Sequence, residues 1–286
     1  LEYSRLFSSA SRRRNIPMNK VLKYILLIVV SGIFLFPILW VIISSFKPQS
    51  ELFTYPLTIL PNKATIENYV NAFASGDFIT YYTNSIFVSI VATLLTITIN
   101  VMAGYALSKF YFRGRDLIFY IMISTLMIPL QAIMIPIFLL LKKLGLLNSL
   151  WGIIIPPAAT PTGVFLARQY LQTIPNSYIE AARMDGASEL RIFLSIIVPL
   201  AQPIIATIAI FSFMWRWNDF LWPFIVISSK RKMTLQLALA NFVGQFQINW
   251  GNLLAMTVVT MIPMIVVFLA LQRYFVQGLS AGGVKA

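Results

Sequence analysis

The chain alternates between long apolar runs and short polar segments. Six apolar runs are each about as long as the ~20 residues that a helix needs to cross the hydrocarbon core of a bilayer. They are Tyr24–Phe46, Tyr81–Ser108, Leu117–Leu141, Leu146–Ala167, a run that begins near Leu200, and Gly251–Leu271. This pattern predicts an all-α polytopic membrane protein with one domain of six transmembrane helices over residues 21–273. Residues 1–20 and 274–286 are then its two tails.

Prolines interrupt two of these runs. Pro129 and Pro136 lie in the third run, and the fourth contains Pro156, Pro157 and Pro161. Because proline lacks a backbone donor and clashes with the preceding turn, we expect kinks in the third helix and an interruption of the fourth. The carbonyl groups freed by the kinks must find partners inside the bundle.

Residues 175–199, called the hairpin below, lie between the fourth and fifth runs. Within twelve residues they carry five charges: Glu180, Arg183, Asp185, Glu189 and Arg191. Ser177 and Glu180 have the spacing of a capping box, which predicts a helix start at Ser177. Gly186 can adopt the left-handed conformation that ends a helix, and Ser188 followed by Glu189 suits a second helix start. The sequence therefore predicts a helix-turn-helix that projects from the bilayer into water.

Composition agrees with a membrane protein and limits its chemistry. Of 286 residues, 58% are apolar and 11% charged, with a mean hydropathy of +0.80, whereas soluble domains have about 25% charged residues. The chain has no Cys and no His, which removes disulfides, thiol chemistry and the commonest metal ligand. It also has no Gly-Lys dipeptide, so it cannot form a P-loop. We expect no catalytic site, metal or cofactor in this chain, so ATP and Mg²⁺ would have to be bound by a separate subunit.

The net charge of +13 follows the predicted topology and does not indicate a nucleic-acid partner. With an inside N-terminus and six spans, cytoplasmic segments hold twice as many Lys and Arg residues as external ones, although residues 230–232 run against this bias. Both termini are therefore predicted to be cytoplasmic. The basic residues of the first tail suit the anionic lipids of the inner membrane face.

The segment Met214–Phe224, called the outer segment below, contains charges within the predicted fifth span. Arg216 and Asp219 are three residues apart, so on one helix they could neutralise each other. Trp215 and Asn218 lie beside them. Aromatic faces and planar polar groups can hold a sugar in a translocation pathway, but an aromatic belt with a structural ion pair explains the same residues.

Three further segments have weaker signals. Residues 65–73 are predicted to form an external helix, with Tyr69 and Phe73 on the membrane surface. The last external loop contains Gln245, Phe246 and Gln247, and residues 272–286 have the small side chains of an extended tail that could pack against a partner.

The hairpin resembles the EAA loop of ABC importer permeases. Glu180, Ala181 and Ala182 are followed by Gly186, Ile196 and Pro199 at the family's spacing, and only Val198 departs from the usual Leu. The outer segment and the C-terminal tail are similar to those of carbohydrate-type permeases. The resemblance implies a type I importer fold in which the hairpin docks into an ATPase. Glu180 would pair with a basic group there, the alanines would form a close-packing face, and Gly186 would be the bend. Asp185 would belong to the same coupling site.

The resemblance also implies the assembly and the transport reaction. Expected partners are a second, homologous permease, two ATPase subunits and an extracytoplasmic solute-binding protein, which the loop at Gln245, Phe246 and Gln247 could contact. The complex would move a carbohydrate across the bacterial cytoplasmic membrane by alternating access. A polyol, a sugar-acid oligomer or a glycerol phosphate ester would fit the same scaffold. The rival classes are an ion-coupled secondary transporter, for which Asp219 is the sole acid inside a span, and a membrane-embedded enzyme, for which the nine acids are too scattered.

Overall fold

A computed structural model describes residues 20–243 and 248–283 of the chain. Within these residues the protein is almost wholly helical, apart from an isolated antiparallel bridge between Val243 and Ile248. The first half contains α1 (Lys20–Ser45), η1 (Gln49–Glu51), α2 (Glu67–Ala74), α3 (Phe78–Lys109), α4 (Arg115–Ser124), η2 (Thr125–Met127) and α5 (Leu130–Lys143). The middle contains α6 (Leu150–Ile154), α7 (Pro161–Gln172), α8 (Ser177–Met184), α9 (Glu189–Ile192), η3 (Phe193–Ile197) and α10 (Val198–Leu200). The last part contains α11 (Gln202–Trp217), α12 (Leu221–Val226), η4 (Lys230–Lys232), α13 (Leu235–Leu239), η5 (Ala240–Phe242) and α14 (Trp250–Gly283).

Three helices are long and apolar enough to cross a membrane singly, namely α1, α3 and α14 up to Arg273. Two further crossings are possible if bent pairs count as single spans. One pair joins α4 and η2 to α5 at 105°, and the other joins residues 189–200 to α11 at 79°. The kink expected at Pro129 is therefore a sharp break, since α5 begins directly after this residue.

The fourth predicted span is interrupted where the three prolines lie. Residues 155–160 separate α6 from α7, and Pro161 occupies the first turn of α7, where its missing donor costs nothing. The buried side chain of Asn100 fixes this break. Its Nδ2 donates to Thr160 Oγ1 at 3.0 Å, and its Oδ1 accepts from the Thr160 backbone N–H at 3.0 Å.

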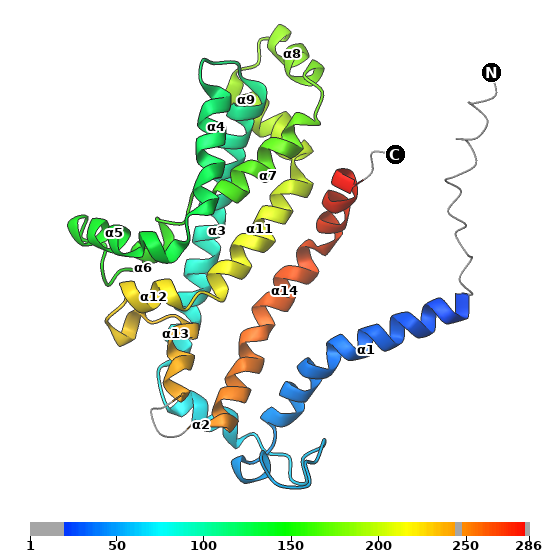
Figure 1. Cartoon of the computed structure of the whole chain (residues 1–286), viewed down its shortest axis with the longest axis vertical. Coiled ribbons are helices and arrows are strands. Elements are labelled where there is room, and N and C mark those ends of the chain that lie inside the picture. The colour runs from blue at the N-terminus through cyan, green and yellow to red at the C-terminus, as the bar shows by residue number, and fades with distance from the viewer. Residues whose placement is uncertain (1–19, 244–247, 284–286) are drawn as a thin grey trace, which may run out of the picture.

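The helix α3 lies at the centre of the molecule and packs against α7 and α11, while α11 also packs against α14 (Figure 1). Glycine makes the contact with α7 possible, because a Cβ added at Gly104 would lie 2.5 Å from the Cβ of Ala167. By contrast, α1 diverges from the bundle, and its most apolar stretch has no buried residue. Figure 1 also shows that α8 lies at one end of the molecule, called the hairpin end below, and that α2 lies at the other. The C-terminal part of α14 points towards the hairpin end.

Two peripheral predictions need correction. The external helix is present as α2, where Phe73 is exposed as expected but Tyr69 is partly buried: its hydroxyl hydrogen-bonds Ser45 Oγ at 2.7 Å and its ring packs on Phe46. Burial against the end of α1 thus outweighs interfacial exposure. The expected extended tail from residue 272 is also wrong, because α14 continues to Gly283. Small residues permit this helix to continue, and no proline follows Pro263 to end it. Residues 1–19 lie outside the described part of the chain.

Candidate functional site

The first leg of the hairpin is α8, which begins at Ser177 as the sequence predicts. It ends in a Schellman motif, since the Ala187 N–H donates to the Ala182 carbonyl and the Gly186 N–H donates to the Arg183 carbonyl. Gly186 has a φ of 77°, which is the left-handed conformation expected for it. The helix-turn-helix interpretation of this segment is therefore confirmed.

The capping box at the start of α8 is wrong. Ser177 is the first helical residue, so the N-cap position falls on Asn176, which makes no side-chain cap hydrogen bond. The Asn176 side chain is engaged elsewhere, because its Oδ1 accepts a hydrogen bond from Lys109 Nζ at 2.9 Å. The second cap is confirmed: Ser188 Oγ accepts from the Arg191 N–H at 3.4 Å and so begins α9.

The second leg of the hairpin runs without a break from α9 through the π-helical segment η3 into α10. At Ala201 the chain turns by 79° into α11, in whose first turn Pro203 lies. Short π-helical segments interrupt the regular hydrogen-bond ladder and are frequent at functional sites. The second leg therefore lies across the bundle and does not simply extend the fifth span.

The two faces of α8 have different surroundings. Ile179 and Ala182 face the bundle, with 3% and 9% of their surface exposed, and belong to a buried cluster with Tyr105 and Ile192. The opposite face is exposed and consists of Tyr178, Glu180, Ala181, Met184 and Asp185. The two alanines of the EAA sequence are thus divided, because Ala182 anchors the helix to its own chain while Ala181 is accessible to another molecule. We call the exposed set the free face of α8.

An ion pair joins the two legs of the hairpin. Arg183 Nε lies 2.6 Å from Glu189 Oε1, and Tyr105 Oη in α3 lies 3.3 Å from the other oxygen of the same carboxylate. The Glu189 carboxylate raises the pKa of the Arg183 guanidinium above its ordinary value, because the hydrogen-bonded pair stabilises the charged form. Glu180 and Asp185 take part in none of the ion pairs of the described residues.

In the outer segment, the predicted pair of Arg216 and Asp219 does not form. The ion pairs within 4 Å in the described part of the chain are Arg115–Asp116, Arg168–Asp116 and Arg183–Glu189. The reason is that α11 ends at Trp217, so a residue beyond this end no longer shares a helix face with Arg216.

The charged groups of the outer segment instead satisfy backbone groups. Arg216 Nη2 donates to the carbonyl oxygen of Pro157 at 3.1 Å, within the break between α6 and α7. Asp219 Oδ1 accepts from the Trp222 N–H at 3.2 Å, at the start of α12. Trp222 Nε1 in turn donates to the Gly152 carbonyl at 3.1 Å. These bonds tie α11 and α12 to the proline-rich break.

The remaining polar and aromatic side chains of the outer segment do not converge on one cavity. Trp217 is buried, and its Nε1 donates to the Thr260 carbonyl in α14 at 2.9 Å. Trp215 is 49% exposed and stacks on Phe211, and Asn218 is exposed. Trp215 and Asn218 are therefore accessible to a second molecule, as are the aromatic rings of Phe220 and Phe224.

Gln245, Phe246 and Gln247 lie outside the described residues. Among the residues that are described, no three acidic side chains gather closely enough to hold a metal ion.

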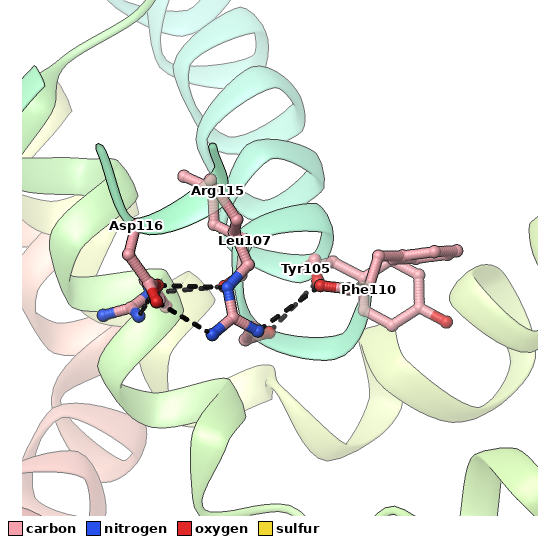
Figure 2. A network of polar contacts seen from close by, with 7 residues as sticks. Tyr105, Leu107, Phe110, Arg115 and Asp116 are labelled. Atoms are coloured by element: carbon pink, nitrogen blue, oxygen red, sulfur yellow. Dashed lines mark hydrogen bonds and ion pairs between the residues drawn. The ribbon is translucent and has the colours of Figure 1, made fainter. Parts of the chain in front are cut away.

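Sequence reasoning missed the network at the base of α4. Arg115 Nε lies 3.1 Å from Asp116 Oδ1, which also accepts from Arg168 Nη2 at 3.2 Å. Figure 2 shows the Arg115 side chain between Asp116 and the Phe110 carbonyl, to which its Nη1 donates at 3.4 Å. The guanidinium of Arg168 lies 3.9 Å from the centre of the Phe119 ring. Nothing in the spacing of these residues indicates the contacts, because Arg168 comes from a different helix.

A bundle of apolar helices with a charged, exposed hairpin at one end defines a multi-pass membrane protein. The comparisons agree with this class. Residues 97–281 match the family described as "Binding-protein-dependent transport system inner membrane component". The chain belongs to this family, and it is a permease subunit.

Two curated relatives and one solved structure extend the likeness to nearly the whole chain. The arabinooligosaccharides transport system permease protein AraQ of Halalkalibacterium halodurans is 37% identical over 277 residues, which cover 96% of this chain and 99% of the relative. The diacetylchitobiose uptake system permease protein NgcG of Streptomyces coelicolor is 34% identical, over 91% of this chain and 87% of the relative. A chain of a bacterial ABC transporter involved in the import of the acidic polysaccharide alginate superposes with a TM-score of 0.79 at 29% identity, over 90% and 96% of the two chains. The type I importer permease fold expected from the sequence is confirmed.

Proposed function

We propose that this chain is a permease of a bacterial ABC importer that moves an oligosaccharide across the cytoplasmic membrane by alternating access. The observation that carries the proposal is the free face of α8. It offers two exposed carboxylates, which form no ion pair with another described residue, and a small Ala181 side chain on a short helix whose other face is fixed in the core. An ATPase with a basic cleft is the partner that such a surface fits, since opposite charges favour docking in one register.

The complete importer would contain a second, related permease, two copies of the ATPase and an external solute-binding protein. ATP and Mg²⁺ would be bound by the ATPase subunits. The hairpin end would face the cytoplasm together with both termini, as the excess of Lys and Arg on those segments favours. Closure of the ATPases on ATP would move the hairpin, and this movement can shift the permease between two states only if the hairpin makes different contacts in each.

The decisive experiment reconstitutes the complex with Glu180→Lys. We expect the ATPase subunits to copurify less with the permease and binding-protein-stimulated ATP hydrolysis and uptake to fall together, because the substitution sets like charges against the proposed basic cleft. Glu67→Lys is the matched control: it makes the same charge change at an exposed acid in α2, at the opposite end of the molecule. If Glu180→Lys leaves copurification and both rates at the level of the control, the ATPase site is wrong.

The proposed substrate class rests on the relatives, two of which are named for oligosaccharide or disaccharide uptake. In this chain, Trp215 and Asn218 are the candidates for contact with a sugar, while Arg216 and Asp219 hold the backbone that positions them. The test is the ligand of the binding protein that copurifies with the assembled complex. A polyol, a sugar acid oligomer or a glycerol phosphate ester found there would correct the substrate class, and uptake driven by an ion gradient without any ATPase would overturn the importer mechanism.

A further inference from the structure

The C-terminal end of α3 contacts both legs of the hairpin. Tyr105 reaches the second leg, because its hydroxyl lies 3.3 Å from Glu189 Oε2 and its ring lies 5.4 Å from that of Phe193. Lys109 reaches the chain before the first leg, where its Nζ donates to the Ile174 carbonyl and to Asn176 Oδ1.

Between these two contacts, Phe110 lies next to the ion pair that joins the legs. The Arg183 guanidinium is 5.7 Å from the centre of the Phe110 ring, and the Phe110 ring packs edge-on against Tyr105 at 5.3 Å. The two legs and their link therefore meet one short stretch of α3. We call Tyr105, Lys109 and Phe110 the α3 clasp.

The same stretch is fixed from its other side by α4 and α7. Arg168 of α7 donates through Nε to the Leu107 carbonyl at 3.2 Å, and Arg115 of α4 donates to the Phe110 carbonyl at 3.4 Å. Asp116 accepts from both guanidinium groups, which links α4 to α7 (Figure 2). The hydrogen bonds of the clasp thus continue into a second network that holds two further helices.

Directional bonds of this kind differ in their effect from the apolar packing beneath α8. Apolar burial holds the hairpin to the bundle but is not directional, so it does not fix the angle of the hairpin. Hydrogen bonds and ion pairs depend on distance and angle, so bonds from α3 to the second leg and to the chain before the first leg fix the orientation of the hairpin.

We propose that the α3 clasp is the positioning device that makes the hairpin turn as one body with α3, α4 and α7. Tyr105 and Lys109 are positioning residues: they do not belong to the free face of α8, and they act on transport through the hairpin. The inference rests on the proposed function, because it assigns the route by which a force from the ATPase reaches the membrane helices.

The test uses the reconstituted complex with Tyr105→Phe and Lys109→Gln combined, and the readout is substrate taken up per ATP hydrolysed. We expect this ratio to fall at least ~5-fold, the lower end of typical coupling between two sites. The ATPase should still copurify at the wild-type ratio, since the free face of α8 is unchanged. The matched control is Tyr120→Phe with Arg113→Gln, which likewise removes one phenol hydroxyl and one positive charge, from exposed positions in α4 and in the turn before it.

A charge exchange gives a readout that general loss of structure would not produce. Arg183→Glu and Glu189→Arg should each lower uptake per ATP, whereas the double variant should recover most of it, because the pair forms again with its charges reversed. The Tyr105 hydroxyl can serve either charge, since it both donates and accepts.

Either of two results would overturn the clasp. One is an unchanged ratio of uptake to hydrolysis in the Tyr105→Phe, Lys109→Gln variant, and the other is loss of the ATPase from the complex, which would make these residues part of folding or docking. The failure of the proposed function looks different, because there Glu180→Lys has no effect on copurification, hydrolysis or uptake.

Discussion

The hairpin and the outer segment are both regions where charges interrupt apolar sequence, but the charged side chains have different partners in the two regions. In the hairpin, Arg183 and Glu189 pair with each other across the two legs, and Glu180 is exposed on the free face. In the outer segment, Arg216 and Asp219 are taken up by backbone groups at a proline-rich break and at a helix start. Arg216, a charge within a predicted span, thus has a partner in a carbonyl group that the prolines leave without a backbone donor. Glu180, a charge on an exposed and anchored helix, forms no ion pair with another described residue.

The largest loss is expected from Gly104→Val, a substitution in α3 at its contact with α7, which supports the hairpin. A Cβ at this position would lie 2.5 Å from the Ala167 Cβ and 2.9 Å from the Arg168 backbone nitrogen. Overpacking a core typically costs ~1–3 kcal/mol, and here backbone must move, so we expect the chain to lose α3–α7 packing. The measurement is the yield of monodisperse protein extracted from membranes, with Gly32→Val in α1, where no atom lies within 4 Å, as the control. Equal yields for the two variants would show that the close approach of α3 to α7 at Gly104 is unimportant for folding.

A smaller loss is expected from Trp217→Phe at the base of the outer segment. The change removes the hydrogen bond from the buried indole to the Thr260 carbonyl, a contribution of ~0.5–1.5 kcal/mol. Thermal unfolding of the purified protein should show a lower midpoint. Trp215→Phe is the control, because Trp215 is half exposed and its indole nitrogen makes no hydrogen bond among the described residues. A midpoint for Trp217→Phe equal to that of the control would contradict the structural role of this indole.

Gly186→Ala tests the turn of the hairpin with a milder change. No atom lies within 4 Å of the added Cβ, but the φ of 77° is unfavourable for alanine by about 1 kcal/mol. Gly114→Ala imposes a similar cost in the turn before α4, at a φ of 87° and also in open space. Faster amide exchange in α8 and lower stimulated ATP hydrolysis are expected for Gly186→Ala alone. If both variants lower hydrolysis equally, the turn has no special part in coupling.

The smallest effect on stability is expected for Trp215→Ala. Its ring is 49% exposed and stacks only on Phe211 among the described rings, so the change in unfolding free energy should stay within ~0.5 kcal/mol. Uptake by the reconstituted complex should nevertheless fall several-fold, because the face is available to a sugar. Unchanged uptake would leave Trp215 as a residue of the aromatic belt, and the outer segment would then be structural throughout.

Local rules predicted the elements well, and long-range contacts account for what they missed. The start of α8, the left-handed Gly186 and the cap at Ser188 each depend on a few neighbouring residues. The three prolines likewise indicated the interruption between α6 and α7. The capping box failed because Lys109, 67 residues away, engages the side chain at the cap position. The pairing of Arg216 with Asp219 failed because the helix ends between them, and helix ends are not fixed by charge spacing.

The right-angled joint at Ala201 has a mechanical consequence. Residues 189–200 form an arm of roughly 18 Å at 1.5 Å per residue, set at 79° to α11. A tilt of about 10° at the joint would therefore displace the tip that carries Gly186 by roughly 3 Å, given the same rise per residue. A small rotation of the membrane helices at this joint is thus linked to a displacement of several ångströms (roughly 3 Å for a 10° tilt) at the exposed tip.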